Sequence, residues 1–351
     1  MKNLQTEKIK SIKKTNRQAN YDLIDFFKLL CALLVVSIHV PFLSEVSEPL
    51  DFALNQYIAR IAVPFFFTAG GYFCFKKTDE NNFDMKIIIN YALRMISLYL
   101  IWVAISSIPL LVLNKFSFST FLKDAFIGYG AFWYLKSSAV SVLLIGILLS
   151  KKINIKKIVI IALFLYLIGL VHLPYHRLLF KTIETLPSWY TRNGIFFGLF
   201  FTSAGAFFAY KNIKISKKLS FLLLVISMAL WAMEVYFLYT RKISTSGTKC
   251  IFLAPSVFLI FYLVLNSQIK FPFNTKILRE LSTYVYFLHG IACNFFLPIC
   301  EKIISLIFGI KFTHTSLLVA YPATVLISVA IALTIMKLKK TKYFSWLKIL
   351  S

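Results

Sequence analysis

Ten long apolar runs most strongly constrain what this chain can fold into. Each is close to the roughly 20 residues that an α-helix needs to cross the hydrocarbon core of a bilayer. Inside hydrocarbon a backbone must satisfy its own hydrogen bonds, so runs of this length predict helices. We therefore expect an all-α polytopic membrane protein with about ten transmembrane helices. The runs cover residues 23–43, 57–75, 87–113, 131–150, 156–173, 192–210, 219–239, 251–267, 281–300 and 315–336.

The composition supports a membrane protein and argues against binding to nucleic acid. Only 15% of the 351 residues are charged, against 59% hydrophobic, whereas about a quarter of a soluble domain is charged. The net charge of +25 comes from short Lys and Arg clusters between apolar runs, such as "KKINIKK" at 151–157. Cytoplasmic loops show this bias. We predict that both termini are cytoplasmic and that the lipid bilayer is the large-scale partner.

The chain reads as one membrane domain with two basic cytoplasmic tails. The predicted divisions are 1–22 for the N-terminal tail, 23–336 for the membrane domain and 337–351 for the C-terminal tail. The first run is too long for a signal-peptide core and no small-residue cleavage site follows it, so we expect it to be retained. The five cysteines lack metal-like spacing, and among the five histidines only His172 and His176, in a predicted outer loop, lie as close as metal ligands on a helix do, so no metal is expected.

Ionisable side chains inside the apolar runs are the candidate functional groups. A charge at the bilayer centre costs about 2.5–3.5 kcal/mol on insertion scales. Lys28 and His39 lie eleven residues apart, about three helical turns, so they share one face at a separation of roughly 16 Å. Such a face suits an extended donor held at Lys28 and reacting at His39. The alternatives are a snorkelling lysine and a structural histidine. Asp25 is expected to pair with Lys28.

Two later runs add further candidates. Arg60 begins the second run, where a guanidinium either orients a carbonyl or acceptor oxygen or anchors the helix at the interface. Ser282 and His289 are two turns apart, about 10 Å, which is too far for a Ser–His dyad within one helix. His289 then needs another partner, or has a structural or pore-lining role. Arg94 enters the third run from the cytoplasmic side and either binds phosphate or snorkels.

Three polar residues on the predicted outer side are candidates for substrate binding. Arg192 and Asn193 begin the sixth run, and Glu234 lies in the outer half of the seventh. An ion pair between Arg192 and Glu234 is the simpler explanation, and we favour it over contact with a substrate.

Four motifs carry a resemblance to a known family. They are the spacing from Lys28 to His39, "RIAVPFFFTAGGYF", "FWYLKSSAV" and "LSTYVYFLHG". With them the chain resembles the integral-membrane acyltransferase 3 family over about residues 22–336. "VPFFF" together with "TRNGIFF" is similar to the membrane portion of membrane-bound serine racemases of vancomycin-resistance systems, and no racemase domain is found in these 351 residues.

The resemblance implies an activity and roles for several residues. Such enzymes of the bacterial inner membrane take an acyl group, usually acetyl, from cytoplasmic acyl-CoA and pass it to a hydroxyl of an extracytoplasmic or lipid-linked glycan. His39 would match the essential histidine, and Lys28 and Arg94 the basic groups near the donor, with Ser282 beside them. Arg60 and His289 would match further motif positions. Acyl-CoA is then a substrate, and no permanently bound cofactor is expected.

The chain departs from the family pattern at four positions. Lys28 stands where arginine is commoner, Gly70 replaces the usual serine, Ala131 occupies a position often held by histidine, and Tyr91 stands where an arginine is expected. A lysine keeps the charge but binds phosphate without the bidentate geometry of arginine.

Acyl transfer to an alcohol needs a base or nucleophile and a group that stabilises the oxyanion. His39 can supply the first and Arg60 the second, so the sequence predicts a membrane O-acyltransferase. Two alternatives remain. The resemblance to membrane racemases permits a domain that transports a small molecule such as an amino acid, and the four departures permit a binding domain without turnover.

Overall fold

The computed structural model describes residues 21–350 apart from 81–82, 115, 128–129, 173–174, 181–190, 245 and 309–314. Within this part of the chain every regular element is a helix and there is no strand, which confirms the all-α prediction. The α-helices are α2 (Asp22–His39), α3 (Glu48–Asp51), α4 (Ala62–Phe75), α5 (Met85–Val112), α6 (Phe118–Ile127), α7 (Trp133–Ser150), α8 (Ile155–Val171), α9 (His176–Phe180), α10 (Leu199–Tyr210), α11 (Lys217–Thr240), α12 (Leu253–Leu265), α13 (Lys276–Ile291), α14 (Leu297–Phe308) and α15 (Leu317–Leu338). Short 3₁₀ or π segments are η1 (Phe42–Glu45), η2 (Phe52–Tyr57), η3 (Ile58–Ile61), η4 (Gly130–Phe132), η6 (Gly194–Gly198), η7 (Ala292–Phe296) and η8 (Ser345–Leu350).

Each of the ten predicted apolar runs overlaps a helix, but the count of ten spans is not confirmed. In the described part of the chain, six continuous helical stretches are long and apolar enough to cross a membrane: Glu48–Phe75, Met85–Val112, Gly130–Ser150, Lys217–Thr240, Lys276–Ile307 and Leu317–Leu338. Two shorter apolar helices cover Gly194–Tyr210 and Leu253–Leu265. Helix α2 is not among the six because Asp22, Asp25 and Lys28 interrupt its apolar character, and α8 is slightly too short.

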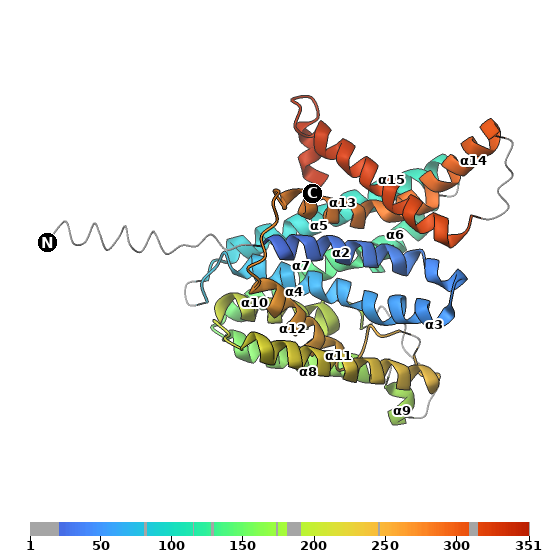
Figure 1. The fold of residues 1–351 in the computed structure, drawn as a ribbon. Coiled ribbons are helices and arrows are strands. Elements are labelled where there is room, and N and C mark those ends of the chain that lie inside the picture. The colour runs from blue at the N-terminus through green and yellow to red at the C-terminus, as the bar shows by residue number, and fades with distance from the viewer. Residues whose placement is uncertain are drawn as a thin grey trace.

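The helices pack in a continuous series with α2 near its middle. Contacts run from α15 to α13, then to α2, α4, α10 and α8, while α5 packs on α7 and α11 on α12. Figure 1 shows α2 and α4 lying side by side between α13 and α15 on one side and α8, α11 and α12 on the other. Several helices therefore surround α2, and its polar residues Asp25 and Ser37 are buried.

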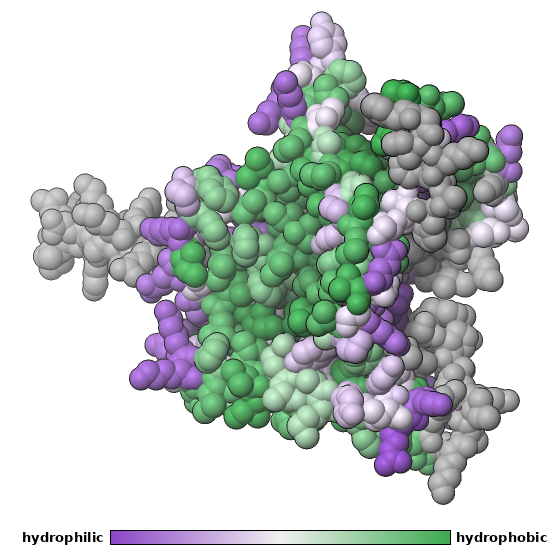
Figure 2. Space-filling model, turned by 45° about the vertical axis from the view of Figure 1, so that its right-hand side comes forward, coloured by the Kyte–Doolittle hydropathy of each residue, from purple (hydrophilic) through white to green (hydrophobic). Residues whose placement is uncertain are grey.

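The surface has the distribution of a protein embedded in lipid. Figure 2 shows a broad hydrophobic face bordered by hydrophilic clusters at opposite ends of the molecule. Large apolar side chains such as Leu93, Phe164, Phe221 and Leu326 are exposed on α5, α8, α11 and α15. A soluble monomer rarely exposes contiguous apolar surface of this extent. Together with the apolar helices, this surface identifies a multi-pass membrane protein.

Helices α4 and α10 approach each other closely at two glycines. A Cβ atom added to Gly71 would lie 2.2 Å from the carbonyl oxygen of Thr202, and one added to Gly205 would lie 2.0 Å from that of Thr68. The two helices thus carry the same Thr-x-x-Gly spacing, and each glycine packs on the backbone of the partner's threonine. Small residues allow this approach in membrane bundles, where burial of apolar surface does not drive helix association.

The C-terminal segment returns to the bundle. In η8, the side chains of Leu347 and Leu350 are buried. The indole Nε1 of Trp102 on α5 donates a hydrogen bond of 3.2 Å to the Leu350 carbonyl. Part of the segment predicted as a tail is therefore packed against the helices.

At the end of the bundle near Lys28, the acidic residue Glu80 holds together segments that connect the helices. Glu80, between α4 and α5, accepts hydrogen bonds from the Lys211 ammonium and, at 2.9 Å, from the Ile155 amide at the start of α8. Partial burial opposes ionisation of Glu80, but these hydrogen bonds outweigh it and lower the pKa of the carboxyl. A carboxylate at a helix start is also favoured by the helix dipole.

The lowered pKa of Glu80 predicts how the stability that its hydrogen bonds contribute depends on pH. Stability from Glu80 should be fully present above its unfolded-state pKa of about 4.3 and lost as the pH falls through the lower folded-state value. We expect Glu80→Gln to lower the melting temperature at pH 7, and the difference from the wild type to shrink progressively as the pH falls below about 4. Thermal unfolding in detergent over this pH range measures the difference. Lys211→Gln and the double variant complete a mutant cycle, and a difference independent of pH would contradict the prediction.

Candidate active site

Two cavities lie along α2, one near each end of the helix. The larger, of about 400 Å³, is lined by Lys28 and is called the Lys28 cavity. The smaller, of about 100 Å³, is lined by His39 and is called the His39 cavity. Tyr286 of α13 lines both, so the two cavities adjoin at this side chain. The two residues predicted to share a face of the first run therefore each border a cavity.

The Lys28 cavity combines positive charge with apolar walls. As far as the structure describes the chain, its lining includes four cationic side chains and no carboxylate. The cations are Lys28, Lys77, Arg94 and Arg279. The Lys28 ammonium lies 4.7 Å from the centre of the Phe73 ring, a cation–π contact that leaves the charge unneutralised. Apolar walls are formed by Phe66, Phe73, Met95, Leu98 and Phe287.

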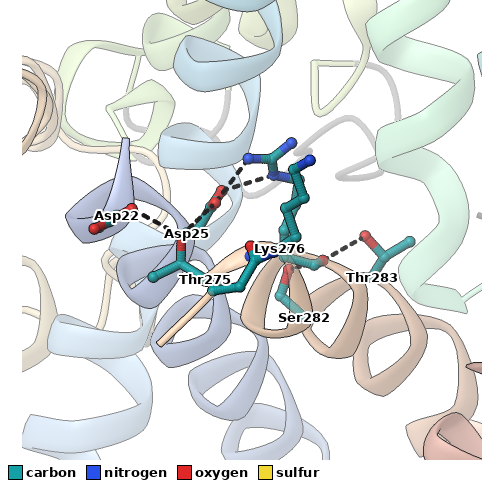
Figure 3. A network of polar contacts seen from close by, with 8 residues as sticks. Asp22, Asp25, Thr275, Lys276, Ser282 and Thr283 are labelled. Carbon is teal, nitrogen blue, oxygen red and sulfur yellow. Dashed lines mark hydrogen bonds and ion pairs between the residues drawn. The ribbon is translucent and has the colours of Figure 1, made fainter. Parts of the chain in front are cut away.

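Asp25 pairs with Arg279 rather than with Lys28 as predicted. The Arg279 Nε and Nη2 atoms each donate to the Asp25 carboxylate at 2.8 Å, a bidentate geometry that lysine cannot form. Thr275 donates to both Asp25 and Asp22, which joins the start of α2 to the start of α13 (Figure 3). The prediction was wrong because the packing of α13 on α2 brings in a partner 254 positions away in the sequence.

Ser282 is placed beside this network. Its hydroxyl donates to the Arg279 carbonyl at 2.8 Å, and Thr283 donates to the same oxygen at 3.1 Å (Figure 3). Both residues line the Lys28 cavity together with Arg279 and Tyr286. Residues 279, 282, 283 and 286 follow helical spacing, so one face of α13 forms a wall of this cavity.

His39 and His289 are neighbours in the structure. Their ring centroids are 5.0 Å apart, across the contact between α2 and α13. His39, the last residue of α2, is exposed and lines the His39 cavity, whereas His289 is only 3% exposed. The Nδ1 atom of His289 lies 2.7 Å from the Tyr286 carbonyl oxygen. A carbonyl can only accept, so Nδ1 carries a proton and donates it to this oxygen.

Arg60 lies at an irregular point of the second helical stretch. It belongs to the 3₁₀ segment η3, between the π-helical η2 and α4. Pro64 has no amide hydrogen to donate to the Arg60 carbonyl, and its ring crowds that oxygen, which disfavours regular α-helix here. The Nη2 atom donates to Gln56 Oε1 at 2.6 Å, whereas the buried Nε atom has no hydrogen-bond partner in the described part of the chain. An unpartnered buried donor beside a cavity is a candidate for contact with a substrate oxygen.

Arg192 lines the same cavity from the start of η6. Its guanidinium carbon lies 4.9 Å from the centre of the Trp133 ring. Asn193 caps the following turn, because its side-chain oxygen accepts from the amides of Ile195 at 2.8 Å and Phe196 at 3.0 Å. The cap fixes the backbone next to Arg192 and so holds the guanidinium at the cavity wall.

The comparison with known proteins agrees with this geometry. Residues 21–337 match the family described as an acyltransferase domain, acyltransferase 3. The chain belongs to the acyltransferase 3 family. It is thus a membrane acyltransferase, of the class that transfers groups other than amino-acyl groups. The resemblance drawn from the motifs is confirmed.

Three curated relatives of this acyltransferase are named as racemases. An amino-acid racemase from Enterococcus faecalis is 33% identical over 291 residues, 76% of this chain and 40% of the relative. A second from the same organism is 28% identical over 275 residues, 72% and 37% of the two chains. A serine/alanine racemase from Enterococcus gallinarum is 27% identical over 285 residues, 76% and 40%. The chain spans about 40% of the length of these relatives. No solved structure matches it.

The expected ion pair between Arg192 and Glu234 does not form among the described residues of this acyltransferase. Glu234 instead accepts from the Tyr175 hydroxyl and from the amides of Ile251 at 2.7 Å and Phe252 at 3.0 Å, at the start of α12. A carboxylate at this place satisfies amides that a helix start leaves unpaired. Glu234 thus caps the start of α12, and Arg192 lines the His39 cavity without this partner.

Two departures from the family pattern lie against each other. A Cβ atom on Gly70 would lie 2.9 Å from the Tyr91 hydroxyl and 3.5 Å from that of Tyr134. Tyr91 therefore occupies space that a side chain at position 70 would fill. The third departure, Ala131, lines the His39 cavity, and its carbonyl accepts a hydrogen bond from the Tyr286 hydroxyl.

Some site residues were not anticipated from the sequence of this acyltransferase. They are Lys77, Arg279 and Tyr286. The spacing of Arg279, Ser282 and Tyr286 on one helical face was a usable signal, because a charged residue and two hydroxyls follow each other at three and four positions. Lys77 had no such signal, since it lies just beyond the end of an apolar helix, where a lysine is ordinary.

Proposed function

We propose that the chain transfers an acyl group, usually acetyl, from acyl-CoA to a hydroxyl of a cell-envelope glycan or lipid-linked sugar. One observation carries the proposal: a cationic cavity and a histidine-lined cavity adjoin at Tyr286. The first suits an anionic donor and the second suits the transfer step. The family match supports the reaction class.

Acyl-CoA has the chemistry that fits the Lys28 cavity. Its phosphates would be held by Lys28 and Arg94, with Lys77 adding a further charge at the cavity lining. Its flexible arm would lie along the apolar side chains and carry the thioester towards Tyr286. The hydroxyl of Ser282, which also lines the cavity, would contact the arm.

The residues at the His39 cavity can perform the transfer. His39 would take the proton from the acceptor hydroxyl as its oxygen attacks the thioester carbonyl. Arg60 would donate from its unpartnered Nε to the oxyanion of the tetrahedral intermediate. The carbon–sulfur bond then breaks, and the proton on His39 passes to the departing CoA thiolate. His289, held by the Tyr286 carbonyl, would keep the His39 ring in place.

This mechanism gives the molecule an orientation in a bacterial inner membrane. Acyl-CoA is cytoplasmic, so the end of the bundle near Lys28 would face the cytoplasm, and the His39 end would face the envelope. The basic connections 151–157 and 211–218 support this orientation. Both termini would then be cytoplasmic, as the sequence predicts.

Transfer of a labelled acyl group tests the proposal. Membrane vesicles with exposed cytoplasmic faces, prepared with and without the protein, are supplied with [¹⁴C]acetyl-CoA. We expect alkali-labile label to accumulate in the glycan or lipid-linked sugar fraction only with the protein. The labelled fraction then identifies the acceptor by mass spectrometry. Equal labelling of both vesicle preparations would contradict the proposal.

One second candidate has support from the comparisons. The relatives are named as amino-acid and serine/alanine racemases, which favours a domain that moves an amino acid across the membrane. In that case the charged side chains would line the path. Uptake of [³H]L-serine and [³H]L-alanine into vesicles of the same two preparations separates the candidates. Protein-dependent uptake without acyl transfer would favour transport.

A further inference from the structure

The His39 cavity holds more positive charge than the transfer step requires. Among the described residues, its lining contains the guanidinium groups of Arg60 and Arg192 beside His39, and no carboxylate. One cation is sufficient to stabilise the oxyanion of a tetrahedral intermediate. Two like charges that face a cavity of about 100 Å³ repel each other, and a bound anion would relieve that repulsion.

Arg192 is not neutralised by a carboxylate in the described part of the chain. Its guanidinium lies against the Trp133 ring, and none of the ion pairs found among the described residues includes it. Glu234, its expected partner, is occupied by Tyr175 and by the start of α12. A stacked guanidinium keeps its N–H donors in the plane of the group, where they can receive a planar or tetrahedral anion.

Lys249, next to Arg192, adds positive charge to this site when its side chain is protonated. The Lys249 ammonium, in the segment between α11 and α12, donates at 2.6 Å to the hydroxyl of Thr191, the residue before Arg192. Burial, reinforced by the charge of Arg192, lowers the pKa of Lys249 to about 7. The neighbouring Thr248 lines the cavity itself. An anion bound in the His39 cavity would contact Arg192 directly, and Lys249 would lie behind Arg192.

We propose that the acceptor carries an anionic group, a carboxylate or a phosphate, close to the hydroxyl that is acylated, and that Arg192 binds this group. The inference rests on the proposed function and names the class of its acceptor. Arg60 is then left for the oxyanion and His39 for the hydroxyl proton. The small cavity admits only the reacting end of the acceptor, so the anion and the hydroxyl must lie on the same or adjacent sugar units.

Binding to the purified full-length protein in nanodiscs is the first test, because it needs no turnover. The probes are D-glucuronate, its uncharged methyl ester, glucose 6-phosphate and glucose. We expect thermal stabilisation by one or both anions at concentrations about ten to a hundred times lower than by their neutral counterparts, the range of one charge-assisted pair. Arg192→Gln should remove this preference and Arg192→Lys should retain part of it.

Turnover is the second test. Acetyl transfer from [¹⁴C]acetyl-CoA to each member of the two pairs is compared in the same nanodiscs, as the ratio of kcat/KM for the anionic and neutral probes. A ratio of about ten or more that falls towards one in Arg192→Gln supports the proposal. Comparing D-glucuronate with its methyl ester tests for a carboxylate on the acceptor. Comparing glucose 6-phosphate with glucose tests for a phosphate. Each ratio compares two probes on the same protein, so a general loss of activity in the variant cancels.

The outcomes separate this inference from the proposed function. Transfer to anionic and neutral probes at equal rates overturns the anionic acceptor and leaves the acyltransferase reaction standing. An Arg192-dependent binding preference without transfer to any probe or vesicle glycan supports the anion site and counts against the reaction. Equal binding of charged and uncharged probes overturns the inference whether or not transfer is seen.

Discussion

His39→Ala should lower the rate of acyl transfer by roughly 10²–10⁴-fold, the usual contribution of a general base. His39 ends α2, is exposed and lines the smaller cavity with Arg60. The nearby His289 is buried and lines neither cavity, so it cannot simply replace His39. The label-transfer assay with [¹⁴C]acetyl-CoA, at matched membrane abundance, measures the loss.

The matched control is His172→Ala. His172 lies at the end of α8 and lines neither cavity, so its replacement should leave the transfer rate within about twofold of the wild type. Thermal stabilisation by acetyl-CoA should survive in His39→Ala, because the donor cations are at the other cavity. If His39→Ala keeps more than a tenth of the wild-type rate, the histidine is not the base.

Gly205→Val should prevent the bundle from assembling. Even the Cβ of alanine would lie 2.0 Å from the Thr68 carbonyl oxygen, which is backbone and cannot rotate away. Because α4 and α10 are in direct contact through this point, they would have to separate. We expect Gly205→Ala to cost roughly 2–4 kcal/mol, and the branched valine to leave little folded protein in the membrane. Yield of monodisperse protein in detergent and its melting temperature provide the measurement.

Gly290→Ala tests whether the stability lost in Gly205→Ala comes from the close approach of α4 and α10. A Cβ at Gly290 in α13 meets no atom within 4 Å. Alanine is the better helix former by about 0.8–1.0 kcal/mol, so this variant should be as stable as the wild type or more stable. The explanation by packing would be wrong if both alanine variants lost the same stability.

The candidate site was partly predictable from the sequence, because some of its features depend on one helix only. Lys28 and His39 share α2 at a spacing that a helix converts into a face, and the structure places them on two adjoining cavities. Their catalytic and donor-binding roles stay predictions. The partner of Asp25 and the position of Glu234 could not be read in this way. Each depends on a segment far away in the chain.

The sequence by itself determined the fold class, the apolar segments and the family. Hydropathy and helical spacing are local properties, and a bilayer forces apolar segments to become helices. The tertiary structure decided which helices meet and therefore which polar groups meet: Asp25 with Arg279, His39 with His289, and Gly71 with Thr202. In lipid both faces of a helix can be apolar, so hydropathy does not mark the face that packs. That choice depends on small residues and hydrogen bonds between distant segments, and only the assembled bundle reveals it.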